Sequence, residues 1–92
     1  MKLLTAENLK QLPPLGSESK TAYVKFFTPD SSWAWYATEY DGKNMFFGLV
    51  DGFEKELGYF TLSELKEVRG KMGLPVERDR HFTPKLLEEI MK

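Results

Sequence analysis

The sequence of 92 residues contains no cysteine and only one histidine, His81. Without cysteine, the chain can form no disulfide bond or thiolate metal site and can carry no thiol nucleophile. This composition suits a reducing compartment, so we expect a cytoplasmic protein. A single histidine also excludes a zinc site built on a pair of histidines. Because His81 lies in a charged, extended segment, we interpret it as a surface residue and not as an acid or base catalyst.

Long apolar runs and glycine-rich loops are absent as well. The N-terminal segment has no apolar run of the length of a signal peptide, and no other stretch is long enough to span a membrane. No glycine pattern cradles a phosphate, and no serine lies in the context of a nucleophile elbow. We therefore expect no membrane association, no cofactor and no catalytic residues. The formal net charge of −1 argues against a dedicated nucleic-acid binder, because such proteins usually carry a basic excess.

Aromatic residues are abundant and concentrated in one stretch of the chain. Of the two Trp, four Tyr and seven Phe residues, all but Phe82 lie between Tyr23 and Phe60. Each aromatic side chain can bury on the order of 150–250 Å², so this stretch can supply the core of one small domain. Its apolar runs are separated by turn sequences such as Asp41-Gly42 and Asp51-Gly52. This pattern is typical of consecutive antiparallel strands joined by tight turns.

The fold is predicted to be a single α+β domain spanning residues 1–92, with a small antiparallel meander sheet of three to five strands and two or three short packing helices. The expected strands are Ala22–Thr28, Trp33–Tyr40, Met45–Val50 and about Phe53–Phe60, with a charged edge strand at Val76–Phe82. Residues 16–20 form a polar segment with little to bury, and we expect a mobile loop there.

Helices are predicted where a capping signal precedes an apolar periodicity. The three segments are Ala6–Leu12 after Thr5, Leu62–Arg69 after Thr61, and Pro84–Met91 after Thr83. The second has the most complete signal, because Thr61 and Glu64 have the spacing of a capping box and Gly70 is expected at the C′ position.

One predicted strand carries more aromatic side chains than a single buried face needs. They are Trp33, Trp35, Tyr36 and Tyr40. Strict alternation places the two tryptophans on one face and the two tyrosines on the other. We expect most of these rings to lie in the core and some to form an exposed patch, because Trp and Tyr are favoured at protein interfaces.

Acidic residues lie at the ends of the predicted strands and would surround such a patch. They are Glu39, Asp41, Asp51 and Glu54. An apolar centre with a charged rim predicts a protein-binding surface. The same acids, together with Glu56, are candidates for a metal site, but Asp-Gly pairs are first of all turn sequences and no ligand spacing supports a metal. The nuclease-like triplet Glu64-Leu65-Lys66 lies in a predicted helix, where we give it no catalytic role.

Several long runs of the sequence resemble one known family. They are Tyr23–Asp30, Trp33–Gly42, Phe46–Val50 and Glu56–Phe60, and the similarity continues through Leu74-Pro75 and Glu77–Asp79 to Phe82. Over almost its whole length the chain resembles the domain of unknown function 2958 family. The resemblance implies a small single-domain protein of a plasmid, a phage or a conjugative element. It implies no catalytic residues for this chain.

Three functions follow from these observations. The first is a non-enzymatic protein-interaction module from a mobile genetic element, in its sharpest form an anti-CRISPR-like inhibitor that binds a CRISPR effector nuclease of the host. The second is an accessory protein of plasmid or phage maintenance with a nucleic-acid-associated role. The third is a small metal-dependent hydrolase or nuclease.

Overall fold

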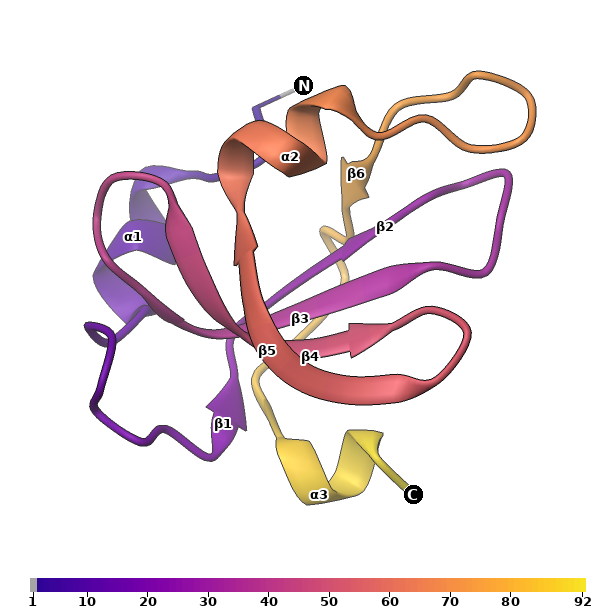
Figure 1. Cartoon of the computed structure of the whole chain (residues 1–92). Coiled ribbons are helices and arrows are strands. Elements are labelled where there is room, and N and C mark those ends of the chain that lie inside the picture. Colours follow the sequence, from indigo (N-terminus) through magenta and orange to yellow (C-terminus); the bar gives the residue numbers. More distant parts are fainter. Residues whose placement is uncertain (1) are drawn as a thin grey trace.

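The computed structural model describes residues 2–92, which form an α+β fold around a five-stranded antiparallel sheet (Figure 1). The strand order is β5-β4-β3-β2-β6. These strands are β2 (Val24–Phe27), β3 (Ala34–Tyr40), β4 (Met45–Asp51), β5 (Lys55–Thr61) and β6 (Glu77–Arg78). A second, two-stranded sheet pairs β1 (Thr21–Ala22) with β7 (Lys85–Leu86), and the helices are α1 (Ala6–Gln11), α2 (Leu62–Glu67) and α3 (Leu87–Ile90). The predicted fold class and meander are confirmed.

The strand boundaries differ from the sequence-based ones where tertiary pairing intervenes. The first predicted strand is divided at Tyr23, because β1 leaves the main sheet to pair with β7. The predicted fourth strand begins at Lys55 and not at Phe53, since residues 52–54 form the turn, in which the Gly52 N–H donates to the Glu54 carbonyl (3.2 Å). The predicted edge strand Val76–Phe82 does lie at an edge, but only β6 pairs with β2.

The first two helices begin where their caps predict. The Thr5 side chain accepts a hydrogen bond from the Asn8 N–H (3.1 Å), and the Thr61 side chain accepts one from the Glu64 N–H (3.1 Å). The Glu64 carboxylate accepts a hydrogen bond from the Thr61 hydroxyl (3.0 Å). In a complete capping box it would instead accept one from the backbone N–H of Thr61. Helix α2 ends at Glu67, two residues before the predicted end.

The predicted terminal helix Pro84–Met91 is wrong in its first half. Residues Lys85 and Leu86 are extended because they pair with β1, and α3 therefore starts only at Leu87, without a side-chain cap. This pairing buries Leu87 against Ala22 and Leu49. Burial in the tertiary structure thus outweighs the local capping signal of Thr83 and Pro84.

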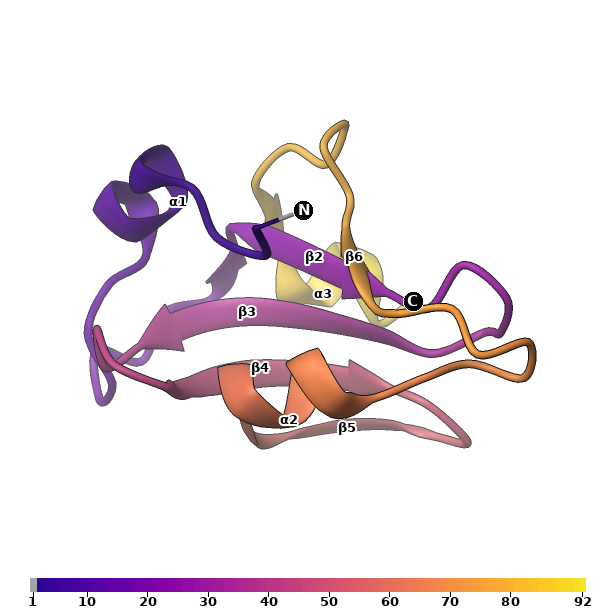
Figure 2. The ribbon, with the colours of Figure 1, turned by 90° about the horizontal axis from the view of Figure 1, so that it is seen from above.

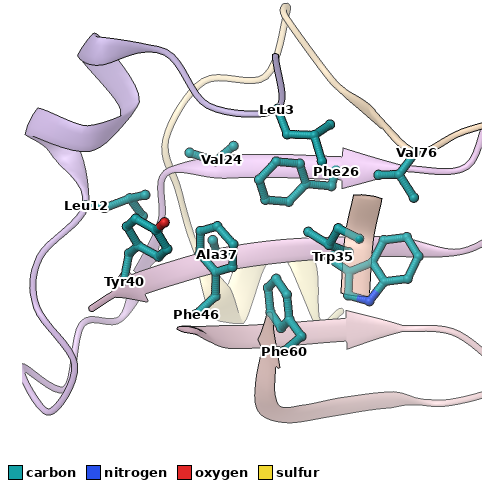
Figure 3. Close-up of a cluster of buried hydrophobic side chains, with 11 residues drawn as sticks. Leu3, Leu12, Val24, Phe26, Trp35, Ala37, Tyr40, Phe46, Phe60 and Val76 are labelled. Carbon is teal, nitrogen blue, oxygen red and sulfur yellow. The ribbon is translucent and has the colours of Figure 1, made fainter. Parts of the chain in front are cut away.

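The larger hydrophobic core lies on one face of the main sheet. Phe26, Trp35, Phe46 and Phe60 project from this face toward side chains of the N-terminal segment (Figure 3). Leu3, Leu12 and Leu65 complete this cluster. A smaller cluster on the opposite face contains Ala22, Leu49 and Leu87, with Tyr36, Phe82 and Ile90 packed against it. Both faces of the sheet are therefore at least partly covered, with α2 on one side and α3 on the other (Figures 1 and 2).

A β-bulge in β3 changes which side chains share a face. The register with β4 shifts between Ala37 and Glu39, so β3 has one residue more than its partner there. As a result Tyr40 lies in the larger cluster with Trp35, and not on the face of Tyr36 as strict alternation predicted.

Loss of the Thr61 cap is expected to destabilise the fold without changing its architecture. Thr61→Ala removes the acceptor of the Glu64 N–H, and the usual cost of losing such a cap is about 0.5–2 kcal/mol in the free energy of unfolding. Thr61→Ser is the matched control, because serine keeps the hydroxyl and should retain most of the stability. Denaturant unfolding measures both, and an unchanged midpoint for Thr61→Ala would mean that the cap contributes nothing.

Candidate interaction surface

The structure does not form the aromatic patch in the place that the sequence predicted. Trp35 and Tyr40 are buried in the larger cluster. Tyr36 is half-buried on the opposite face, where its ring lies 5.9 Å from that of Phe82. The rings separate because the sheet is covered on both faces and the bulge redirects Tyr40. Of the four predicted aromatic residues, Trp33 remains at a candidate surface.

The Glu39 carboxylate is buried and holds a loop, so it is not part of a charged rim. Its Oε1 accepts a hydrogen bond from the Gly16 N–H (2.8 Å), and its Oε2 accepts one from the Ser19 N–H (2.9 Å). A buried carboxylate requires such donors, because otherwise its desolvation would be costly. The loop predicted to be mobile is therefore anchored to β3.

The Asp41 carboxylate organises the hairpin between β3 and β4. Its Oδ1 accepts hydrogen bonds from the backbone N–H groups of Lys43 (2.8 Å), Asn44 (2.8 Å) and Met45 (3.0 Å). These bonds stabilise the charged form and lower the pKa of the Asp41 carboxyl group. Burial, and secondarily the Asp41 charge, raises the pKa of the Tyr40 hydroxyl. The interpretation of Asp41-Gly42 as a turn is confirmed.

Three loops gather at the end of the sheet that lies to the right in Figures 1 and 2. They comprise residues 28–33, 52–54 and 68–76. Asp30 connects two of them, because its Oδ2 accepts hydrogen bonds from the backbone N–H groups of Met72 (2.7 Å) and Leu74 (3.3 Å). Gly70 lies so close to this carboxylate that a Cβ there would overlap with it. Gly70 is thus required for loop packing, and not at the predicted helix C′ position.

Trp33 is the central side chain of this end of the molecule. The Phe53 ring contacts it edge-on, with 5.4 Å between ring centroids, and the Trp35 ring lies 6.0 Å away. Gly52 lies directly against the indole, where a Cβ would overlap with the ring. Phe53 itself is 95% exposed, and Met72 on the neighbouring loop is also largely exposed. We call Trp33, Phe53 and Met72 the aromatic end.

Two clefts flank Trp33, which lines both. One has a volume of about 290 Å³ and the other about 310 Å³. The first is also lined by Val50, Gly52, Phe53, Glu54 and Glu56, and the second by Thr28, Ser31, Trp35, Val68 and Arg69. Acidic side chains therefore border the Phe53 side of the indole, while the Arg69 guanidinium donates to the Lys66 and Val68 carbonyls (2.8 Å each).

The structure places the predicted acids Asp51 and Glu54 on either side of the Gly52-Phe53 turn, and Glu54 lines a cleft together with Trp33. Sequence reasoning missed Phe53 and Met72 as exposed side chains. The signal for Phe53 was its position directly after Asp51-Gly52, because a residue at a hairpin tip has few neighbours to bury it.

The described residues hold no group of three or more His, Asp or Glu side chains that could bind a metal ion. Within residues 2–92, no helix has the length and apolar character needed to cross a membrane.

Residues 3–88 match the profile of a protein family described as "Protein of unknown function (DUF2958)", and the chain belongs to this family. No curated protein and no solved structure matches the chain.

Replacing Asp41 is expected to make the stability depend less on pH. Asp41→Asn keeps a side-chain oxygen but loses the charge that the three N–H groups favour. Because the pKa of Asp41 is lower in the folded state, its charge stabilises the fold above the unfolded-state pKa of about 3.9, and this contribution is lost as the pH falls through the folded-state pKa.

Denaturant unfolding of both proteins between about pH 7 and pH 2.5 measures this effect. Wild type should be more stable at neutral pH, and the difference should shrink below about pH 4. A difference that stays constant over this range would contradict the assigned role of the carboxylate.

Gly70→Ala is expected to lower the free energy of unfolding by about 1–3 kcal/mol, the usual cost of forcing an extra group into a packed site. The new Cβ must displace the Asp30 carboxylate from the N–H groups of Met72 and Leu74. In an Asp30→Ala background the obstacle is absent, so the same substitution should cost much less. Equal costs in the two backgrounds, measured by chemical unfolding, would show that Asp30 is not the group in contact.

Proposed function

We propose that this member of the DUF2958 family is a non-enzymatic module that binds a partner protein through its aromatic end. The observation that carries the proposal is the position of Phe53, which is 95% exposed and packed edge-on against Trp33. Fully burying a phenylalanine side chain is worth about 1.5–3 kcal/mol relative to leaving it in water. A bound partner would supply that burial.

The aromatic end has the composition and the rigidity that favour protein binding. Aromatic residues and Met are enriched in the centres of protein interfaces. The indole of Trp33 is fixed by its contacts with Gly52 and Trp35, so little side-chain entropy is lost when a partner packs on it. The adjoining clefts also provide concave apolar surface of the kind in which hot-spot residues of a partner bury their side chains.

The acids beside the aromatic end favour a basic partner surface. Glu54 and Glu56 line the cleft next to Phe53, and Asp51 precedes the same turn. Opposite charges on a partner would accelerate association. The same acids would repel phosphate groups, which supports a protein partner over a nucleic acid for this surface.

More specifically, we propose that the protein inhibits a host defence nuclease in the cytoplasm, such as a CRISPR effector. Such nucleases hold nucleic acid in a positively charged channel. An acidic and aromatic end could compete for that channel. The resemblance to proteins of plasmids, phages and conjugative elements supports this context.

Phe53→Ala is expected to weaken partner binding about tenfold or more, which corresponds to about 1.4 kcal/mol or more. Because the ring is exposed, the thermal midpoint of the protein should change little. Affinity capture with tagged protein, from a host that carries its defence systems, identifies the partner. Titration of the purified partner then compares dissociation constants, and a cleavage assay tests inhibition if the partner is a nuclease.

Leu9→Ala is the control, because Leu9 is an exposed apolar residue in α1, which lies at the opposite end of the sheet from the aromatic end (Figures 1 and 2). This variant should bind the partner like wild type. If the Phe53→Ala variant binds the partner as tightly as wild type does, the assignment of this surface is wrong.

A further inference from the structure

The two edges of the main sheet differ in how they limit further strand pairing. β6 forms one edge with only two residues, both charged, and short charged edge strands resist pairing with another chain. β5 forms the other edge with seven residues and pairs with β4 along its whole length without a bulge. Within residues 2–92 no strand pairs with the outer side of β5, which is the outermost strand in Figure 2.

Backbone groups of β5 alternate between facing β4 and facing away from the sheet. The Leu62 N–H donates to the Asn44 carbonyl (2.8 Å), just beyond the end of the β4–β5 ladder. Hydrogen-bonded pairs recur at every second residue of an antiparallel ladder, so the even-numbered residues of β5 bond to β4. The N–H and C=O groups of Leu57 and Tyr59 therefore point outward.

The side chains beside these outward groups are apolar and exposed. Leu57 is 50% exposed and Tyr59 is 67% exposed, and both lie on the same face of the sheet because they are two residues apart. Between them Gly58 has open space where a Cβ would lie. The Nζ of Lys55, the one lysine of the strand, donates to the Ile90 carbonyl (3.1 Å) within its own chain, so it does not guard the edge.

We propose that β5 pairs antiparallel with β5 of a second copy of this chain, about a two-fold axis at Gly58. In this register the seven residues of both strands overlap completely. Gly58 lies opposite Gly58, and Leu57 lies opposite Tyr59 on either side of the axis. Because Leu57 and Tyr59 carry the outward backbone groups, each such pair exchanges two hydrogen bonds, and their side chains cover each other.

The charges of β5 fit a second copy in this register. Lys55 lies opposite Thr61 and Glu56 lies opposite Phe60, so no two like charges face each other. With Leu57 covering Tyr59 and no like charges opposed, the strand can pair with its own copy over all seven residues, which favours a second copy as the occupant. Pairing joins the two main sheets into one and directs the two aromatic ends in opposite directions, because the strands run antiparallel. This inference stands independently of the proposed function.

Sedimentation velocity of the full chain over a range of concentrations tests the dimer. We expect the mass to rise from 10.7 kDa toward twice that value. Leu57→Lys should raise the dissociation constant of the dimer about tenfold or more, because a lysine on an edge strand opposes pairing. Leu9→Lys is the matched control, since Leu9 is 49% exposed, and it should dimerise like wild type.

A single cysteine tests the register independently of Leu57. The chain has no other cysteine, so Gly58→Cys should form a covalent dimer on mild oxidation. Residues opposite each other in a non-hydrogen-bonded pair have Cα atoms about 4.5 Å apart, within the range that a disulfide spans. Leu9→Cys should form little covalent dimer under the same conditions. A wild-type protein that stays monomeric up to about 1 mM, association that Leu57→Lys leaves unchanged, or failure of Gly58→Cys to cross-link would each overturn the proposal.

Discussion

The packing of Phe46 against three aromatic neighbours is the interaction on which the rest of the structure depends. Its side chain is fully buried, with ring centroids 4.4 Å from Tyr40, 5.2 Å from Phe60 and 5.5 Å from Phe26. The four rings come from β2, β3, β4 and β5, so a single cluster holds four strands in register. A chain of this size buries a smaller share of its surface than a large domain does, and few other side chains could replace the area that these rings remove from water.

Carboxylates hold the loops around this core. Asp30 and Glu39 each accept hydrogen bonds from two backbone N–H groups of another segment, and Asp41 accepts three from the turn that follows it. In a chain without disulfides, such bonds fix loops that would otherwise be ordered only by weak contacts. The acidic residues that suggested a charged rim in the sequence are therefore divided between this structural role and the surface near Trp33.

Although both faces of the sheet are partly covered, the aromatic end and the outer edge of β5 expose apolar side chains. The first lies on loops, where a hairpin tip keeps Phe53 out of the core. The second lies on a strand in which the same two residues, Leu57 and Tyr59, carry the outward backbone groups and the exposed side chains. The two surfaces share Glu56 but not their apolar side chains, because Phe53 lies outside the seven residues that would pair, so Phe53 stays available to a partner while the β5 edge is occupied.

Local sequence determined the elements, and tertiary contacts determined what they expose. Turn sequences, apolar alternation and the caps at Thr5 and Thr61 predicted the α+β meander and two helix starts, because these signals act between residues close in the chain. Only the assembled sheet decided that a bulge moves Tyr40 into the core, that pairing with β1 replaces the first turn of the last helix, and that Phe53 stays in water. The reason is that exposure depends on contacts between residues far apart in sequence. The alternation of side chains along one strand gives no information about those contacts.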